Sequence, residues 1–323
     1  MKKRRVIITG GGLPLFNEEQ QAYLWDLAPD AELIFTDNIM KTIQEYDDAD
    51  ALVSGPKLPA EVWDWCVKAP GFKWFHCLIS GVDAIMKTPL KDLDITITST
   101  KGIHGPMISD QALAFIFAFL RGVHFWVRGQ RDHRWVRDEI GERLDESFNK
   151  TVGVVGVGNI GMEVCRKCKA LGMRTIGVKR TVIESPYLDA CYTLADVDKL
   201  FAEADFVVLT CPLTSETEKL INAETLRKMK KNAVVINLAR GAVVDHEALL
   251  SALDEGIIAG AGLDIFETEP LPSDSPLWDH ENIIISHHTA PKTPYLMDRA
   301  VKVVGENLVN FLNGKPLNHI AER

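Results

Sequence analysis

Three polar motifs at positions 237–290 carry residue types that could perform proton transfer and anion binding. In each motif the charged or imidazole side chain comes after a short apolar run, and the motifs read Asn237-Leu-Ala-Arg240-Gly241, Gly262-Leu-Asp264-Ile-Phe-Glu-Thr-Glu269-Pro270 and Asn282-Ile-Ile-Ile-Ser-His287-His288-Thr-Ala290. A guanidinium can fix a carboxylate, an imidazole can move a hydroxyl proton, and a carboxylate beside the imidazole favours its charged form. Reduction of a 2-keto acid requires these groups. Taken singly, Arg240 could instead be a surface ion pair and Glu269 a turn carboxylate.

A glycine-rich loop, Gly156-Val157-Gly158-Asn159-Ile160-Gly161, lies between the apolar run 152–155 and a helical pattern over 159–171. In a dinucleotide-binding turn, the first glycine permits the tight turn, the second lets the backbone approach the pyrophosphate, and the third lets the helix pack against the strand. The N-terminus of the helix then faces the phosphate charge. We therefore expect Gly156, Gly158, Asn159, Ile160 and Gly161 to bind a nicotinamide dinucleotide. The alternative is a glycine turn without a ligand.

The residues after the next apolar run should distinguish the two nicotinamide dinucleotides. An acidic side chain there would bind the ribose hydroxyls of NAD and repel the 2′-phosphate of NADP. This chain has Lys179-Arg180-Thr181, about 18 residues after the last glycine, close to the expected distance of about 20. Two cations and a hydroxyl favour NADP(H) over NAD(H), with Arg180 able to form a paired hydrogen-bond fork. The alternatives are an exposed basic turn, or Glu184 or Asp189 as a displaced acidic selector.

The order of apolar runs predicts the elements that hold these residues. Short β-rich runs alternate with helical patterns over about the first 100 residues and again after residue 150, which is typical of parallel sheets with helices on both faces. The expected strands lie at 6–9, 32–36, 51–54, 73–77 and 94–98, and then at 151–155, 174–179, 205–210, 233–238, 257–263 and 282–286. The fold class is therefore α/β, with two doubly wound, Rossmann-like domains. Ligands of such sheets bind beyond the carboxyl ends of the strands, where the polar motifs lie.

Two helices are expected to link the two series. A pattern that is apolar on nearly every side covers 106–127, as in a helix packed between domains. An amphipathic helix at 296–312 has no strand after it, and we expect it to return to the first domain. Shorter helices are expected at 222–230 and 246–255.

The composition excludes several classes of protein. At 323 residues the chain exceeds one ordinary core, and hydrophobic residues at 46% and charged residues at 25% are typical of globular proteins. A net charge of −9 argues against nucleic acid or a membrane surface as a partner. The longest apolar run, 112–120, is shorter than the about 20 residues of a membrane span. The apolar run after the basic start of the chain is too short for a signal peptide, so we expect a cytoplasmic protein.

Two further patterns have alternative interpretations. Six scattered cysteines favour reduced thiols, and no metal site is expected. Cys165 and Cys168 form a C-x-x-C inside a helix, where ordinary packing is favoured over redox or metal chemistry. The second pattern is a row of arginines at every third position: Arg128, Arg131, Arg134 and Arg137. A phosphate-binding surface is possible there, but a solvated or subunit-contact surface is favoured.

The combination of motifs resembles the D-isomer-specific 2-hydroxyacid dehydrogenase family, in particular NADP-type glyoxylate/hydroxypyruvate reductases. The resemblance covers nearly the whole chain, from Gly81-Val82-Asp83 through the glycine loop, Pro212-Leu213-Thr214 and the three polar motifs to the last helix. It implies a discontinuous substrate-binding domain formed by residues 1–101 and 291–323. It also implies a nicotinamide-binding domain formed by residues 102–290, and a homodimer.

By this resemblance, Arg240, Glu269 and His288 are the catalytic residues. Arg240 would bind the carboxylate and carbonyl of the substrate, Glu269 would pair with the histidine, and His288 would be the general acid/base. The family usually has Pro-His where this chain has His287-His288. Alignment of the two ends of the motif assigns His287 to the proline position, so His288 is favoured as the catalytic histidine. His287 would otherwise be a pocket wall or a packed histidine.

The resemblance also assigns binding residues. The backbone N–H groups of Ser80 and Gly81 would hold the substrate carboxylate, together with Arg240 and His288. The cofactor-binding set gains four residues near the nicotinamide: Cys211, Pro212, Asp264 and Ala290. Each of these could otherwise be a turn residue.

The function that follows is reversible NAD(P)H-dependent reduction of a small 2-keto acid to a D-2-hydroxy acid by an NADP-preferring enzyme. Glyoxylate, hydroxypyruvate and larger 2-keto acids all stay open as substrates. Formate dehydrogenases of the family have glutamine in place of the glutamate, so Glu269 argues against that activity. The alternative from another class is a dinucleotide-sensing, corepressor-like binding protein of the same fold.

Overall fold

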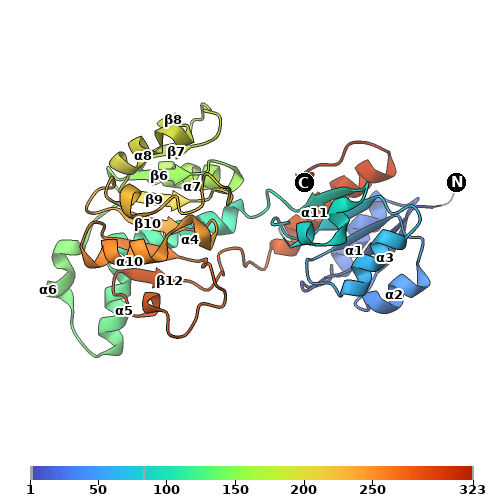
Figure 1. Ribbon diagram of the computed structural model, residues 1–323, viewed down its shortest axis with the longest axis horizontal. Coiled ribbons are helices and arrows are strands. Elements are labelled where there is room, and N and C mark those ends of the chain that lie inside the picture. The colour runs from blue at the N-terminus through green and yellow to red at the C-terminus, as the bar shows by residue number, and fades with distance from the viewer. Residues whose placement is uncertain (1–2, 83, 322–323) are drawn as a thin grey trace. The chain divides into compact units, whose positions relative to one another are not determined.

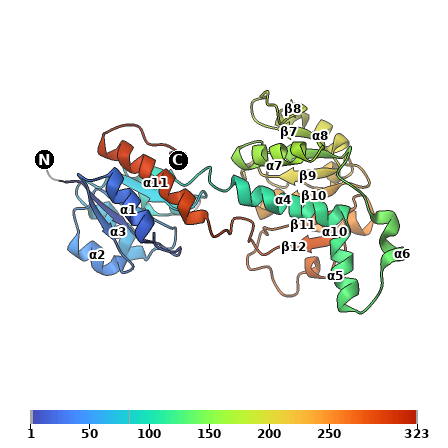
Figure 2. The same ribbon diagram turned by 180° about the vertical axis from the view of Figure 1, so that it is seen from behind.

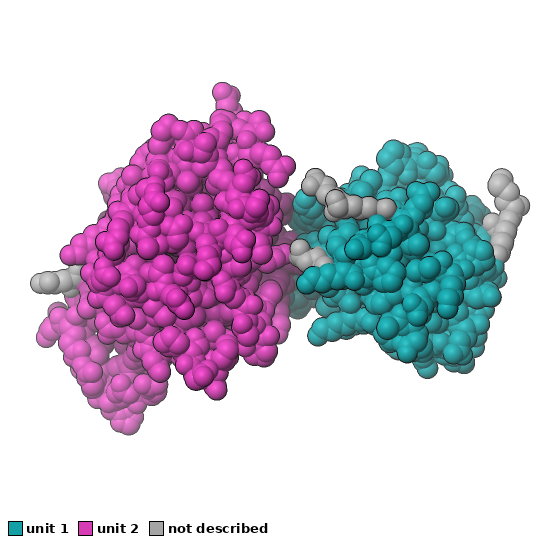
Figure 3. Space-filling view, viewed as in Figure 1, with its two compact units in different colours: residues 1–103, 293–323 teal, residues 104–292 magenta. Residues whose placement is uncertain are grey.

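The computed structural model describes residues 3–82 and 84–321, apart from the side chain of Glu142. The strands of this part of the chain form two sheets in which every paired strand is parallel to its neighbour (Figure 1). The predicted α/β fold with two doubly wound sheets is confirmed. The chain divides into two compact units, which Figure 3 distinguishes by colour. Unit 1 comprises Met1–Ile103 and Thr293–Arg323, and unit 2 comprises His104–Lys292.

Unit 1 contains a five-stranded sheet in the order β2-β1-β3-β4-β5. Its strands are β1 (Arg5–Ile8), β2 (Glu32–Phe35), β3 (Ala51–Ser54), β4 (Trp74–Cys77) and β5 (Thr96–Ser99). Alternate residues of a strand face opposite sides of the sheet, and both sides are apolar because helices cover both. In β1, Val6 and Ile8 belong to one core cluster and Ile7 belongs to the other.

Helices of unit 1 cover both faces of this sheet. They are α1 (Glu18–Leu27), α2 (Ile39–Glu45), α3 (Ala60–Lys68), the short 3₁₀ helices η1 (Ile85–Lys87) and η2 (Pro89–Asp92), and α11 (Leu296–Leu312). Helix α11 packs beside α1 on one face (Figure 2), and α2 and α3 cover the other. Asn17 begins α1 with a capping box in which its side chain and that of Gln20 satisfy each other's backbone N–H. The predicted return of the last helix to the first series of strands is therefore observed.

Unit 2 contains a seven-stranded sheet in the order β12-β11-β10-β9-β6-β7-β8. Its strands are β6 (Thr151–Val155), β7 (Arg174–Val178), β8 (Ala190–Tyr192), β9 (Phe206–Leu209), β10 (Val234–Asn237), β11 (Gly260–Leu263) and β12 (Ile283–Ile285). From β6 the chain first adds β7 and β8 on one side and then β9 to β12 on the other. This reversal between β6 and β9 is the position at which doubly wound sheets bind ligands.

The helices of unit 2 are shorter than the sequence predicted in two places. They are α4 (Gly105–Leu120), α5 (Val123–Arg131), α6 (Arg137–Ile140), α7 (Asn159–Ala170), α8 (Val197–Glu203), α9 (Ala223–Leu226) and α10 (His246–Asp254), with the 3₁₀ helices η3 (Gly141–Arg143), η4 (Leu194–Asp196), η5 (Gly241–Val243) and η6 (Pro276–Trp278). The expected helix 106–127 is broken between α4 and α5, because Gly122 adopts a left-handed φ of 64°. The expected helix 222–230 is reduced to the four residues of α9.

Within the described residues, no single helix is long and apolar enough to cross a membrane, and α4 and α5 reach that length only together, with a bend of 69° between them.

The two cysteines of the C-x-x-C motif lie on the buried face of α7. Cys165 and Cys168 are both buried, and burial raises the pKa of each thiol to about 12. Nucleophilic and metal-binding thiols require the thiolate, which such a pKa disfavours. The structure therefore supports the packing role over the redox alternative.

Three of the four arginines in the row at positions 128–137 make contacts within unit 2. Arg128 donates hydrogen bonds to the carbonyl oxygens of Glu281 and His280 at 2.6 and 3.4 Å. Arg134 pairs with Glu139, and Arg131 pairs with Asp132. These contacts engage three of the four guanidinium groups that a phosphate-binding surface would use.

Candidate active site

The three predicted catalytic residues lie on loops that start at one edge of the unit 2 sheet. In the sheet register, Asn237 at the end of β10 pairs with Leu209 of β9 and Leu263 of β11, and Leu263 pairs with Ile285 of β12. The carboxyl ends of these strands are therefore level. Polar residues that directly follow them are brought to the same edge, as parallel sheets require.

Glu269 and His288 form a direct pair. The Nδ1 atom of His288 lies 2.7 Å from Oε2 of Glu269, with the two side chains 49% and 34% exposed. The other carboxylate oxygen of Glu269 accepts a hydrogen bond from the backbone N–H of Phe266 at 3.0 Å. Among the described residues, Nε2 of His288 has no hydrogen-bond partner. A carboxylate fixed in this way orients the imidazole and presents Nε2 as its proton-transferring atom.

The loop that carries His288 folds around a buried carboxylate. Asp264 has no exposed surface and accepts hydrogen bonds from the hydroxyl of Ser286 and the backbone N–H groups of Thr289 and Ala290. Its own carbonyl oxygen accepts from the N–H of His288 at 2.8 Å. These bonds hold His288 at a φ of 51°, a left-handed conformation that few non-glycine residues adopt. The structure thus gives Asp264 a supporting role that the sequence did not predict.

Arg240 lies on a turn that a buried asparagine closes. The side chain of Asn237 donates to the carbonyl oxygen of Arg240 at 2.9 Å and accepts from the N–H of Ala239 at 3.0 Å. The guanidinium donates to the carbonyl oxygen of Ala239 at 2.8 Å. Asn237 was missed as a functional residue, although a polar side chain that ends a buried apolar strand was the available signal.

Gly241 brings the Arg240 turn against the segment that leads to Glu269. A Cβ atom at position 241 would lie 2.1 Å from the carbonyl carbon of Phe266 and 2.2 Å from the backbone nitrogen of Glu267. Only glycine permits so close an approach of two backbones. The spacing between the arginine and the glutamate therefore depends on this glycine.

Substitution of Gly241 by alanine is expected to lower both stability and activity. The added methyl group must push the two backbones apart, which costs about 1–3 kcal/mol of unfolding free energy and displaces Arg240 from Glu269. A displacement of this kind reduces turnover by about tenfold or more. Gly141→Ala is the matched control, because position 141 has a helical φ of −55° and nothing within 4 Å of an added Cβ. Equal thermal unfolding and kcat in both variants would contradict the prediction.

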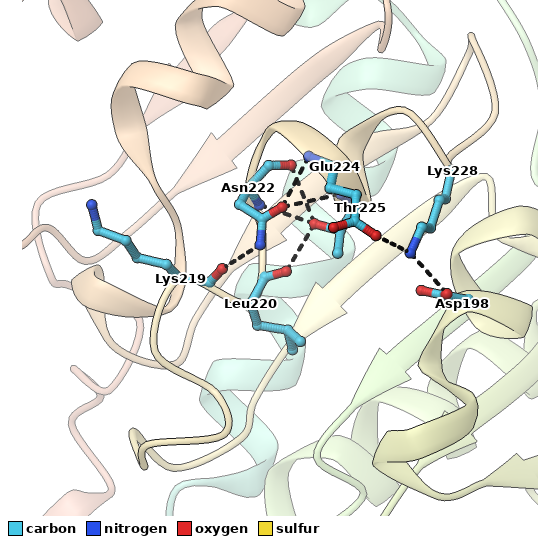
Figure 4. A network of polar contacts seen from close by, with 7 residues as sticks. All are labelled: Asp198, Lys219, Leu220, Asn222, Glu224, Thr225 and Lys228. Atoms are coloured by element: carbon cyan, nitrogen blue, oxygen red, sulfur yellow. Dashed lines mark hydrogen bonds and ion pairs between the residues drawn. The ribbon is translucent and has the colours of Figure 1, made fainter.

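A neighbouring segment, residues 219–225, is hydrogen-bonded to the same turn, and Figure 4 shows the polar contacts within this segment. Asn222 caps α9 through the N–H groups of Glu224 and Thr225, and its amide donates to the carbonyl oxygen of Lys219 at 2.9 Å. The N–H of Lys219 in turn donates to the carbonyl oxygen of Ala242 at 2.7 Å. The residues directly after Arg240 and Gly241 are thereby fixed to a capped helix.

The glycine loop follows β6 at the same sheet edge. Gly156 has a φ of 97°, and a Cβ atom there would lie 2.5 Å from the Cα of Cys211. A Cβ atom on Gly161 would lie 2.5 Å from the carbonyl oxygen of Gly156, whereas one on Gly158 would meet nothing within 4 Å. Two glycines are thus required by packing, and Gly158 leaves open space beside the N-terminus of α7. This arrangement fits a dinucleotide phosphate, and it brings Cys211 beside the glycine loop.

The residues after β7 are basic at the edge that faces the glycine loop. Lys179 is half-buried and Arg180 and Thr181 are exposed, and within the described part of the chain neither cation is paired with a carboxylate. Asp189 lies elsewhere: its carboxylate accepts from the N–H of Thr175 at 2.8 Å, near the start of β7, and pairs with Lys169. The structure therefore argues against Asp189 as the acidic residue that would bind the ribose hydroxyls of NAD.

Ser80 and Gly81, the predicted substrate-carboxylate residues, follow β4 in unit 1. The hydroxyl of Ser80 donates to the carbonyl oxygen of Thr100 at 3.1 Å. Asp83, the last residue of the matched Gly81-Val82-Asp83 motif, lies outside the described residues. No group of three or more His, Cys, Asp or Glu side chains placed to hold a metal ion occurs in the described part of either unit.

Comparisons with known proteins agree with this architecture. The family model for D-isomer specific 2-hydroxyacid dehydrogenase, NAD binding domain, matches residues 113–290. A glyoxylate reductase of Korarchaeum cryptofilum is 35% identical over 322 residues, covering 97% of this chain and 94% of the relative.

Two solved structures are similar over almost their full length. A D-isomer specific 2-hydroxyacid dehydrogenase family protein of Aeromonas salmonicida is 27% identical with a TM-score of 0.84, covering 99% of each chain. The NADPH-dependent glyoxylate/hydroxypyruvate reductase of Sinorhizobium meliloti, solved with NADP and sulfate, is 27% identical with a TM-score of 0.80, covering 99% of this chain and 98% of that one. The family model and the full-length similarity to known members both show that the chain belongs to the D-isomer specific 2-hydroxyacid dehydrogenase family.

Proposed function

We propose that the protein catalyses the reversible NAD(P)H-dependent reduction of a small 2-keto acid to a D-2-hydroxy acid. The observation that carries this proposal is the Glu269–His288 pair, 2.7 Å apart, at the sheet edge that also bears the glycine loop. The glyoxylate reductase and the glyoxylate/hydroxypyruvate reductase among the similar proteins support the same reaction class.

In this mechanism each side chain has one role. The bound reduced nicotinamide supplies the hydride. His288 donates the proton from Nε2 to the substrate's carbonyl oxygen as it gains negative charge, and Glu269 stabilises the charged imidazole before that transfer. Arg240 holds the substrate carboxylate through its planar N–H groups. Ser80 and Gly81 are proposed to bind the same carboxylate through their backbone N–H groups.

A substrate panel tests the reaction. We expect oxidation of the reduced cofactor with at least one of glyoxylate, hydroxypyruvate and longer 2-keto acids, followed as the loss of absorbance of the reduced nicotinamide. Absence of turnover with every acid, together with intact dinucleotide binding, would instead support the dinucleotide-sensing alternative.

We propose NADP(H) as the preferred cofactor. Lys179 and Arg180 directly follow β7, where the adenosine ribose lies in such folds, and their charges suit a 2′-phosphate. The NADP complex of the Sinorhizobium meliloti reductase is consistent with this preference. Asp264, Cys211, Pro212 and Ala290 are proposed to lie near the nicotinamide.

Replacement of both Lys179 and Arg180 by alanine is expected to raise the KM for NADPH by about 10- to 100-fold, because charge-assisted hydrogen bonds to the phosphate are lost. The KM for NADH should change little. Lys231→Ala is the control, since Lys231 is an exposed cation before β10, at the opposite edge of the sheet. A wild-type preference for NADH, or equal changes for both cofactors, would refute the assignment.

A homodimer formed through the α5–α6 segment is also proposed. This segment leaves four large apolar side chains exposed to solvent, and Trp135 is 90% exposed; the four are Val123, Trp126, Val127 and Trp135. Several exposed large apolar side chains on one segment are typical of a protein interface. We expect the wild-type protein to have the mass of two chains in light scattering, and the double variant Val127→Glu/Trp135→Glu to have the mass of one. A monomeric wild-type protein would contradict the proposal.

A further inference from the structure

We propose that His287 is a positioning residue that holds His288 through the contact of its ring with Trp278. The centroids of the two rings lie 5.8 Å apart, with an angle of 31° between the ring planes. The inference rests on the proposed function, because it assumes that His288 transfers the proton. It gives a role to His287, for which the sequence left two interpretations open, a pocket wall or a packed side chain.

The backbone of His288 is strained and needs support from more than one side. Its φ of 51° lies in the left-handed region, which non-glycine residues keep only where the surroundings enforce it. On the interior side, the backbone carbonyl oxygen of Asp264 accepts a hydrogen bond from the N–H of His288 at 2.8 Å. The carboxylate of Glu269 accepts a hydrogen bond from Nδ1 of the His288 ring at 2.7 Å. On the side facing solvent, the preceding residue of the chain is His287, which is exposed and contacts the indole ring of Trp278.

Trp278 is fixed independently of the loop that carries the two histidines. It ends η6, where its indole N–H donates to the carbonyl oxygen of Pro272 at 2.8 Å and its backbone N–H donates to Ser275 at 3.2 Å. The adjacent Leu277 is buried in the core of unit 2. The indole is therefore a fixed surface against which a ring at position 287 can rest.

The contact restrains the peptide that joins the two histidines. Rotation of this peptide would turn His288 away from Glu269 and would also lift the ring of His287 from the indole. Aromatic rings in contact resist such separation with an energy equivalent to about two- to tenfold in a rate. The ring at position 287, rather than its basicity, is what the proposed role requires.

Four variants test the inference with steady-state kinetics. We expect His287→Ala and Trp278→Ala each to lower kcat by about two- to tenfold, with the KM for the keto acid and the dissociation constant for NADPH unchanged. His287→Phe should keep kcat within about twofold of the wild type, because it keeps the stacked ring. The double variant His287→Ala/Trp278→Ala should lower kcat no further than either single variant does, because the two substitutions remove the same contact.

Several kinetic results would overturn the inference. Full activity of His287→Ala, equal losses in His287→Ala and His287→Phe, or losses that multiply in the double variant would exclude a role through the indole. A rise in KM without a fall in kcat would make His287 a substrate contact instead. If His287→Ala does not fold, the comparison of Trp278→Ala with Trp278→Phe tests the same contact from the other ring. A wild-type protein without turnover would overturn the proposed function together with this inference, whereas full activity of His287→Ala would overturn this inference alone.

Discussion

Replacement of His288 by glutamine is expected to lower kcat for 2-keto acid reduction by about 10²- to 10⁴-fold, because the general acid is lost. Glutamine is polar and of similar reach, so it can keep the contact with Glu269, but it cannot deliver a proton near neutral pH. The dissociation constant for NADPH should stay close to that of the wild type, since the glycine loop is unchanged. Steady-state kinetics and a fluorescence titration of the cofactor measure the two effects separately.

His133→Gln is the control for this substitution. His133 is also exposed and also has a left-handed φ, of 53°, but it lies between α5 and α6. Its replacement should leave kcat unchanged. A His288→Gln variant that keeps more than about one tenth of the wild-type kcat would show that another group supplies the proton.

The second large effect is expected from Arg240→Lys, which should lower kcat/KM by about 10- to 100-fold. Lysine keeps the positive charge but cannot form two parallel hydrogen bonds with a carboxylate, and such charge-assisted bonds are among the stronger ones in proteins. The backbone turn at position 240 should be unaffected, because Asn237 binds the backbone carbonyl of residue 240 and not the side chain of that residue.

Arg227→Lys is the matched control, because Arg227 is exposed and makes only a loose ion pair with Glu255 at 3.7 Å. Surface pairs of this kind contribute little. Unchanged kcat/KM in Arg240→Lys, with the control equally unchanged, would exclude Arg240 as the carboxylate anchor.

Most of the sheet architecture could be predicted from the sequence. Strands buried on both faces appear as short continuous apolar runs, and the order of runs and helical patterns determines a doubly wound topology. The glycine loop was recognisable because a tight turn and a close helix–strand contact impose glycine at fixed spacing. The observed close approach of Gly156 to Cys211 has the same cause.

Prediction from the sequence was wrong or incomplete where the structure depends on a single backbone angle or on a very short element. The break between α4 and α5 depends on the left-handed φ of Gly122, but glycine is also tolerated inside helices. Strand β8, only three residues long, was not predicted, because Ala190–Tyr192 has too few residues to show alternation.

In the candidate site, the sequence predicted the Glu269–His288 contact but not its supports. Resemblance to the family placed the two residues in one site, and the structure shows them 2.7 Å apart. The roles of Asp264 below the loop and of Gly241 against Phe266 depend on which strands are neighbours and on their register. Such contacts join positions that are distant in the chain, and a single sequence contains no local signal for them.

Transfer of deuterium from the reduced cofactor to the product tests the proposed reaction most directly. Wild-type protein is incubated with hydroxypyruvate and NADPH that carries deuterium on the transferring C4 position of the nicotinamide, and the product is analysed by mass spectrometry and chiral chromatography. We expect D-glycerate with deuterium at C2, because the hydride moves directly and the proton from His288 goes to oxygen. A product of L configuration, or one without deuterium at C2, would contradict the proposed function.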